Sequence, residues 1–543
     1  MLFNSLEFLV FLAIVYALYR VLPFRLQNYM LLAASYVFYG WWDWRFLFLI
    51  AFSTVVDFWV GLTMQNQIGR REKVLPSVFI ALAAMLFLGT HPPELVASLV
   101  GQSSGGEAIR PIMPWIVGGI AVFLTAAALW YRTLMGMSER ARRKAALLTS
   151  VVVQLGLLGT FKYFNFFADS FVTALNRFGY DPDPVTISIV LPVGISFYTF
   201  QSLSYAIDIY RGDFKPTKRF FDFALFVSYF PQMVAGPIER ARHLLPEFQK
   251  ARVITLEQSA RGVYLILLGL FKKVAIADGV APAVNQVFGS SGVVTAGDVV
   301  IGTLLFAVQI YCDFSGYSDI ARGVSKLFGI DLMLNFNLPY FAKSPRDFWR
   351  RWHISLSTWL SDYLYRSLGG NRGTLAFTCR NLMLTMILGG LWHGAAWNYV
   401  LWGFYHGTLL SAHRIATDGK GAPAAPERKN YVIGAAKIGF FFIFTLYGWL
   451  LFRATSLEQV VTFTGLLLTG SGGLDYGAAM PRLSAAIGIP LLIAMELIEY
   501  NSGNRYWYRR LRLPLMGLFA ALMLFLILMG ASNEPAQFIY FQF

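Results

Sequence analysis

Long apolar stretches, each about as long as a membrane span, recur along the chain from Leu2 to Gly530. A helix needs about 20 mostly apolar residues to cross a bilayer. On that basis the pattern predicts roughly 11 to 13 transmembrane or re-entrant helices. We therefore expect an all-α polytopic membrane protein that folds as one membrane domain over residues 1–543.

Regular spans fill the N-terminal part of the chain, residues 1–163. They lie near 2–20, 27–41, 46–64, 74–90, 115–131 and 146–163, and the loops between them are alternately basic and less basic. The positive-inside rule places the basic loops in the cytoplasm and the N-terminus outside. The first stretch has neither a basic leader nor a cleavage site, so we expect a retained span.

The C-terminal spans occupy residues 431–543, and a basic segment before the last of them places the C-terminus outside as well. The Gly-rich, Ala-rich and Pro-rich segment 417–430, just before these spans, is expected to be a flexible loop.

The central part, residues 185–416, has a different pattern. Its apolar segments 185–210 and 220–236 are short, interrupted by proline and glycine, and carry polar side chains. Broken helices at membrane depth are tolerated where protein or a water-filled cavity covers their backbone. The pattern therefore predicts re-entrant elements around a cavity.

The stretch 344–368, SPRDFWRRWHISLSTWLSDYLYRSL, has the spacing of an amphipathic helix on the cytoplasmic side. Ser344 fits the N-cap, Pro345 fits the first helical position, and Asp347 can complete a capping box. His353 and Ser357 fall on the flank of its apolar stripe. A helix lying on the lipid headgroups is the alternative interpretation.

The stretch GGLWHGAAWNYVLWGFYHG begins at Gly389 and lies mostly within an uncharged run, 382–404, that contains His393. On one helix, Gly389 and Gly390 would come one turn before His393 and Trp397 one turn after it. That arrangement leaves room for a ligand or for close packing of another helix. The alternative is a core histidine bonded to a neighbouring helix.

Other histidines are weaker candidates. His406 does not share a helical face with His393, so we expect a structural or interfacial role. His243 lies in a basic, interfacial segment. Asp313 and Asp319 fall on different faces of a helix, and either could orient a histidine or pair with Arg346 or Arg350. Structural pairing is the favoured interpretation.

Composition and motifs exclude several classes of function. The net charge of +15 comes from short loops between spans, which argues against nucleic-acid binding. The two cysteines, Cys312 and Cys379, lie in or beside apolar segments, and no metal-ligand spacing is present. Nor is there a nucleophile elbow, a P-loop or a dinucleotide fingerprint. What remains is a histidine that acts as a general base on a hydroxyl.

The two histidine stretches together resemble the signature of the membrane-bound O-acyltransferases. Similarity to the AlgI-like subgroup, which serves alginate O-acetylation, extends to NYMLLAASYVFYGWWDWRFL, LPVGISFYTFQSLSYAIDIYRG, YFPQMVAGPIERARHLLPEF and FIYFQF. The resemblance implies a bundle around a central tunnel, with His393 as the catalytic residue and His353 as the second signature residue. The remaining candidates, for substrate binding, are Gly389, Gly390, Trp397, Ser357, Asp313 and Arg350.

The resemblance also implies the reaction and its surroundings. The acyl group would come from a cytoplasmic donor, acetyl-CoA or another thioester, with no bound cofactor or metal. The acceptor would be an extracytoplasmic polysaccharide such as alginate, reached with a periplasmic or membrane-anchored SGNH-type partner at the bacterial inner membrane. Peptidoglycan or cellulose O-acetylation, teichoic acid D-alanylation and acylation of a lipid or protein stay open as alternatives. So does transport of a lipid-linked or polysaccharide intermediate.

Overall fold

The computed structural model describes residues 1–99, 108–180, 189–233, 236–289, 294–418, 431–473, 476–477, 480–532 and 538–539. In these ranges nine helical stretches are long and apolar enough to cross a membrane. Two of these stretches, Phe24–Met64 and Glu139–Arg177, contain more than one helix. The expected all-α polytopic membrane protein is confirmed, whereas the predicted loop 417–430 lies almost wholly outside the described residues.

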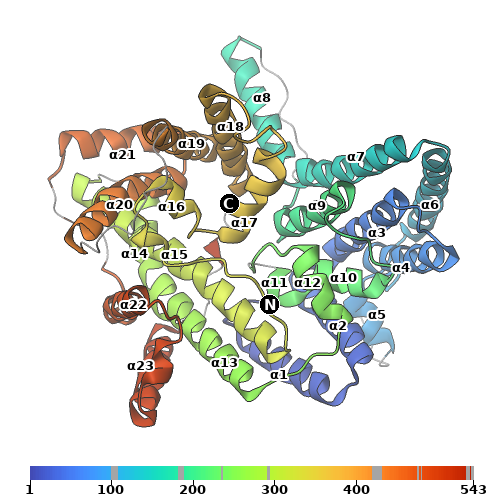
Figure 1. Cartoon of the computed structure of the whole chain (residues 1–543), viewed down its shortest axis with the longest axis horizontal. Coiled ribbons are helices and arrows are strands. Elements are labelled where there is room, and N and C mark those ends of the chain that lie inside the picture. Colours follow the sequence, from blue (N-terminus) through green and yellow to red (C-terminus); the bar gives the residue numbers. More distant parts are fainter. Residues whose placement is uncertain are drawn as a thin grey trace.

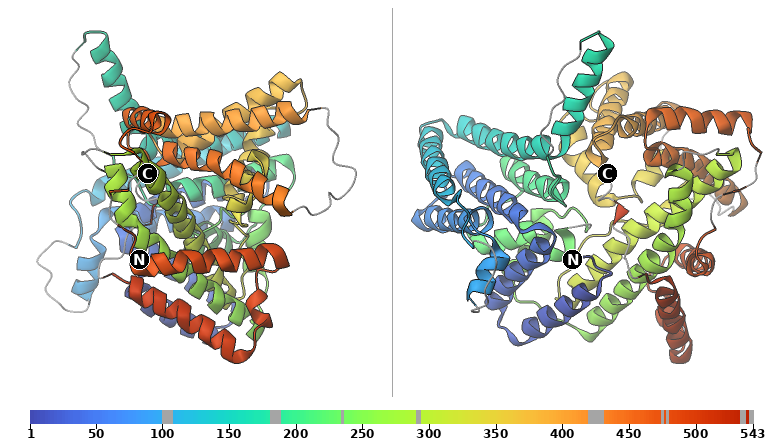
Figure 2. Two further views of the ribbon diagram at one scale, coloured as in Figure 1. Left: turned by 90° about the vertical axis from the view of Figure 1, so that its left-hand side faces the viewer. Right: turned by 180° about the vertical axis from the view of Figure 1, so that it is seen from behind.

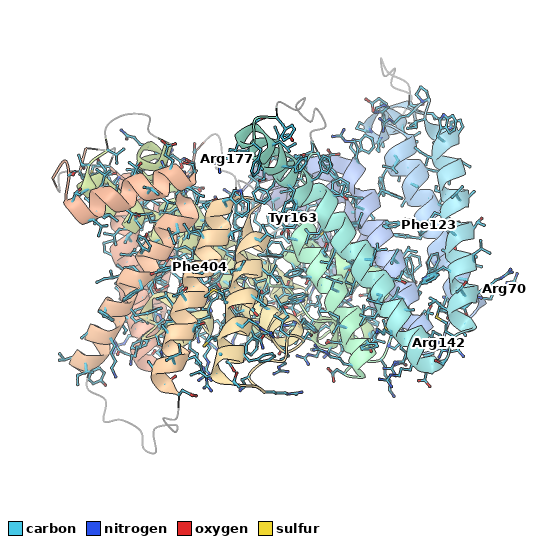
Figure 3. The ribbon with its side chains drawn as sticks, turned by 90° about the horizontal axis from the view of Figure 1, so that it is seen from above. Arg70, Phe123, Arg142, Tyr163, Arg177 and Phe404 are labelled. Atoms are coloured by element: carbon cyan, nitrogen blue, oxygen red, sulfur yellow. The ribbon has the colours of Figure 1, made fainter. Side chains whose placement is uncertain are left out.

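The N-terminal helices follow the predicted spans closely. They are α1 (Leu6–Val21), α2 (Phe24–Asp43), α3 (Leu47–Met64), α4 (Arg70–Gly89), α5 (Pro92–Leu99), α6 (Met113–Met135), α7 (Glu139–Leu158) and α8 (Phe164–Arg177). A short 3₁₀ turn, η1 (Trp44–Phe46), precedes α3, and a π-helical turn, η2 (Gly159–Tyr163), joins α7 to α8. Arg70 and Arg142, from two predicted basic loops, lie toward the lower side of Figure 3, and Arg177 lies toward the upper side.

The central elements are more broken, as the sequence predicted for 185–210 and 220–236, although they include one helix of 32 residues. They comprise α9 (Ile195–Arg211), α10 (Phe220–Ser228), α11 (Phe230–Met233), α12 (Ala241–Gln249), α13 (Leu256–Leu270), η3 (Phe271–Ala277), α14 (Asp278–Gly289), α15 (Ala296–Leu327), η4 (Pro339–Phe341), α16 (Pro345–Trp349), α17 (Ile354–Trp359), η5 (Leu360–Tyr365), α18 (Leu375–His393) and α19 (Trp397–Thr417). The C-terminal elements are α20 (Tyr431–Arg453), α21 (Leu457–Thr469), α22 (Leu483–Ser502), η6 (Trp507–Arg510) and α23 (Leu513–Gly530).

The broken elements lie between two outer groups of helices. Figure 1 shows α3 to α7 on one side and α20 to α23 on the other, with α9, α11, α15 and α17 between them. Helix α8 projects from the edge of the molecule in Figures 1 and 2. The C-terminal Phe538 enters the middle, where its ring centroid lies 4.5 Å from that of Tyr317 and 5.7 Å from that of Phe314.

The uncharged run 382–404 is two helices and not one. Helix α18 ends at His393, and Gly394 and Ala396 are extended before α19 begins. The two helices then pack along each other, and Gly390 and Gly403 face across the contact. A Cβ on Gly390 would overlap the Tyr399 carbonyl oxygen and lie 3.1 Å from the Gly403 Cα. Gly390 therefore allows close packing of another helix, which was one of the two roles that its position before His393 suggested, the other being room for a ligand.

Enlarging Gly390 tests this close approach. Gly390→Leu should destabilise the protein by about 1–3 kcal/mol, because the added atoms have no space between the two backbones. The measurement is the midpoint of thermal unfolding of detergent-solubilised protein. Gly118→Leu is the control, since a Cβ at Gly118 meets nothing within 4 Å. Equal midpoints for both variants would contradict the packing.

Candidate active site

His393 occupies the last position of α18 and is 3% exposed. Aromatic rings enclose its imidazole, whose centroid lies 5.1 Å from that of Trp402 in α19 and 5.4 Å from that of Phe452 in α20. His393 lies at a helix end because α18 stops there and the chain reverses direction before α19 begins at Trp397. This helix end lies inside the bundle.

His353 lies at a bend, and the predicted single amphipathic helix over 344–368 is wrong. The stretch divides into α16, α17 and the π-helical turn η5, and His353 between α16 and α17 has φ 42° and ψ 54°. Such left-handed backbone costs a non-glycine residue roughly 1–3 kcal/mol and is concentrated at functional sites. The imidazole is fully buried, so the alternative of a helix lying on the lipid headgroups does not hold at His353.

The start of this stretch matches the prediction more closely. Ser344 is the N-cap, and its hydroxyl accepts from the Asp347 amide (3.2 Å), with Pro345 at the first helical position. The Asp347 carboxylate accepts from the amide of Lys343 (3.0 Å) instead of closing a capping box on Ser344.

Asn335 holds the bend at His353. Its main-chain carbonyl accepts from the Ile354 amide (2.9 Å). Its side-chain oxygen accepts from the Ser355 main-chain amide (3.3 Å) and from the Ser355 hydroxyl (3.0 Å). The Asn335 side-chain amide donates to Ser318 in α15 (3.2 Å). One buried side chain thus connects the first turn of α17 to the long central helix.

The two bends bring the histidines together. The imidazole centroids of His353 and His393 lie 6.2 Å apart. Phe314 of α15 covers His353 at 4.7 Å, and Trp392 of α18 lies 5.9 Å from His353 and 5.1 Å from His393. Residues from three distant parts of the chain thus form one buried, mostly aromatic site.

Three further candidates for substrate binding differ in their surroundings. Gly389 lies on α18, where a Cβ would come 3.0 Å from Leu360, and Ser357 donates from its hydroxyl to the Trp352 carbonyl (3.0 Å). Arg350 is exposed.

Trp397 is exposed at the start of the next helix. It is not one turn after His393 on the same helix, because α19 begins there, and it is 53% exposed against Phe166. The prediction that Trp397 lies one turn after His393 on the same helix is therefore wrong.

The acidic pair Asp313 and Asp319 is engaged in ion pairs, although with partners other than those predicted. Asp313 pairs with Lys273 (2.9 Å) and accepts from the Ile539 amide (2.6 Å). Asp319 pairs with Lys272 (3.0 Å) and Arg505 (2.6 Å). The preference for structural pairing is confirmed, while Arg346 and Arg350 are not the partners. Asp313 thereby ties the C-terminal segment to α15.

His243 and His406 have structural contacts. His243 of α12 shares a 2.7 Å hydrogen bond with Glu239, which raises the pKa of the imidazole, and the other Glu239 oxygen accepts from the Met333 amide (2.6 Å). His406 packs against Trp402 and Trp349, with ring centroids 4.7 and 5.2 Å apart. Among the described residues, no three His, Cys, Asp or Glu side chains converge as a metal site would require.

Sequence reasoning missed Lys162 and Tyr163 on η2. The Lys162 ammonium donates to the carbonyls of Trp392 (2.6 Å) and His393 (3.1 Å). The Tyr163 hydroxyl donates to the Leu391 carbonyl (2.9 Å). A lysine within the apolar segment LLGTFKYFNFF was the available signal, because ionisable residues at membrane depth are expensive.

The fold and the site are those of a polytopic helical membrane protein with two buried histidines at helix breaks. Comparison with known proteins identifies the family. Residues 217–457 match the membrane-bound O-acyltransferase family. The probable alginate O-acetylase AlgI of Azotobacter vinelandii is 41% identical over 84% of this chain and 76% of its own length. The chain therefore belongs to the membrane-bound O-acyltransferase family, and it is an acyltransferase.

Two further relatives have other names. The peptidoglycan O-acetyltransferase of Helicobacter pylori is 33% identical over 68% of this chain and 72% of its own length. The teichoic acid D-alanyltransferase of Bacillus subtilis is 30% identical over 41% of this chain and 59% of its own length. Similarity is thus more extensive toward the alginate O-acetylase.

Removing the Asn335 side chain tests how the His353 bend is held. Asn335→Ala should lower the free energy of unfolding by about 1–3 kcal/mol, because buried amide and hydroxyl groups lose their partner. Thermal unfolding of the solubilised protein measures the change. Asn337→Ala is the matched control, since Asn337 bonds to Arg351 through its backbone. A wild-type midpoint for Asn335→Ala would contradict the role of Asn335.

Proposed function

We propose that this protein passes an acetyl group from a cytoplasmic thioester, such as acetyl-CoA, across the membrane for O-acetylation of an extracytoplasmic polysaccharide such as alginate. His393 acts as the general base. The observation that carries the proposal is the buried position of His393, 6.2 Å from His353 between ring centroids, in a chain of this family.

The reaction requires one proton transfer to the base and one bond exchange. His393 takes the proton of an acceptor hydroxyl while the hydroxyl oxygen attacks the acyl carbonyl carbon. The new C–O bond forms, the C–S bond breaks, and the departing thiolate takes up the proton. His353 stabilises charge or holds one of the two substrates. General-base assistance contributes about 10² to 10⁴ in rate.

The surroundings of the pair suit this chemistry. Burial among aromatic side chains excludes water, which would otherwise hydrolyse the thioester. In a site of low dielectric, each dipole directed at the developing oxyanion acts more strongly than in water. The donor enters from the cytoplasm and the acceptor from the opposite side, along the tunnel that the family resemblance implies.

The acceptor is inferred from the relatives. The alginate O-acetylase of Azotobacter vinelandii aligns with 84% of this chain, against 68% for the peptidoglycan O-acetyltransferase and 41% for the D-alanyltransferase. This favours an exopolysaccharide over peptidoglycan or teichoic acid. We place the protein in the bacterial inner membrane, with both termini periplasmic and an SGNH-type partner that completes delivery.

A transporter of a lipid-linked or polysaccharide intermediate is the alternative from another class. Radiolabelled acetyl-CoA supplied to membranes with the partner separates the two. The proposal requires a covalent acetyl product, and movement of polysaccharide without one would favour transport.

Replacing His393 tests the assignment of the base. His393→Ala should reduce polysaccharide acetylation by about 10² or more, because the acceptor hydroxyl loses its proton acceptor. Acetyl content per unit of polysaccharide, at matched membrane abundance, is the measurement. His413→Ala, a half-buried histidine later in α19, should retain wild-type acetylation. Near-normal acetylation by His393→Ala would overturn the assignment.

A further inference from the structure

The end of α18 creates a problem that water cannot solve. The last carbonyls of a helix have no partner within that helix, and the hydrocarbon region contains no water to bond them. Gly394 is extended, so α18 does not continue past His393, and the Gly394 amide returns to the Gly390 carbonyl at 3.4 Å. The carbonyls at the His393 end need donors from elsewhere.

Another helix supplies these donors. Lys162 bonds to the carbonyls of Trp392 and His393, and Tyr163 bonds to the carbonyl of Leu391. Three successive carbonyls are therefore satisfied by two successive residues about 230 positions earlier in the chain, the separation between Lys162 and Trp392. A cation at this place also interacts favourably with the negative end of the helix dipole.

The element that presents the two residues is itself unusual. They belong to the π-helical turn η2 between α7 and α8. Such π turns are rare overall, and those that occur are often found at functional sites. The junction of α7 and α8 at η2, marked by Tyr163 in Figure 3, lies beside the helices of the site, and Figure 1 shows that α8 projects there at an angle to α7. The Lys162 ammonium also lies 5.8 Å from the Trp392 ring centroid, so it fixes the residue before His393 through both backbone and ring.

We propose that Lys162 is a positioning residue for the reaction: its ammonium holds the end of α18 and so sets where the His393 imidazole meets its substrates. This inference rests on the proposed function of His393. Lys162 acts through main-chain carbonyls, and its removal should displace His393 without removing a substrate contact. A small misplacement of a reacting group can cost about 10² in rate.

The test compares three substitutions in the full-length protein in membranes. Lys162→Met retains the aliphatic stem without the charge, Lys162→Gln keeps a neutral donor, and Lys162→Arg keeps a cation of similar reach. Initial rates of acetyl transfer are measured against acetyl-CoA concentration, together with membrane abundance and the thermal midpoint. Lys73→Met is the matched control, an exposed lysine whose ammonium lies 4.5 Å from the Tyr131 ring centroid.

The expected result is a separation of kcat from KM. Lys162→Met and Lys162→Gln should lower kcat by about 10² with KM changed less than about twofold, and Lys162→Arg should recover most of kcat. Lys73→Met should match the wild type. If Lys162→Met fails to accumulate, Lys162→Gln decides between the outcomes.

Two results would overturn the inference. One is a wild-type kcat for Lys162→Met or Lys162→Gln, and the other is a loss of activity that follows membrane abundance alone in all three variants. Both are distinguishable from failure of the proposed function, because His393→Ala would then still be inactive. If His393→Ala stays active, the proposed function fails first.

Discussion

A helix that ends inside a membrane must have its terminal carbonyls bonded by protein, because the hydrocarbon region offers no water. This constraint acts on α18, whose last residue is His393. Lys162 and Tyr163 meet it from η2, with bonds to three successive carbonyls. Without these donors the break after His393 would be costly. Because the break places the imidazole at a helix end, the geometry of the site depends on this capping.

The same principle operates at the second histidine. Asn335 bonds to the first amides of α17, which allows the chain to bend at His353 in left-handed backbone. On the other side of the site, Gly390 and Gly403 let α18 and α19 approach until their backbones touch. Each device sacrifices helical regularity, and together they place two imidazoles from separate segments 6.2 Å apart between ring centroids. Broken helices are thus what assembles the site.

Hydropathy predicted the N-terminal spans and the interrupted centre, and capping rules located Ser344 and Pro345 correctly. Periodicity failed at His353 and after His393, because local sequence there favours continuous helix. Asn335 stabilises the break at His353 and Lys162 stabilises the break after His393. Each of these residues lies well outside the helix whose end it bonds, so the local sequence around the two histidines does not reveal the breaks. Closeness of the two histidines was likewise invisible to spacing and came into view only through the family resemblance and the structure. The ion pairs of Asp313 and Asp319 were expected in kind, but their partners lie on other helices.

The central claim is that an acetyl group crosses the membrane through the buried histidine site. Inside-out membrane vesicles that enclose the polysaccharide and the partner protein test it directly, with radiolabelled acetyl-CoA added outside, at the exposed cytoplasmic face. The account predicts covalent label on the enclosed polysaccharide with the wild-type protein and background label with His393→Ala. Label that appears only when acetyl-CoA is enclosed together with the polysaccharide, or equally with both proteins, would contradict the account.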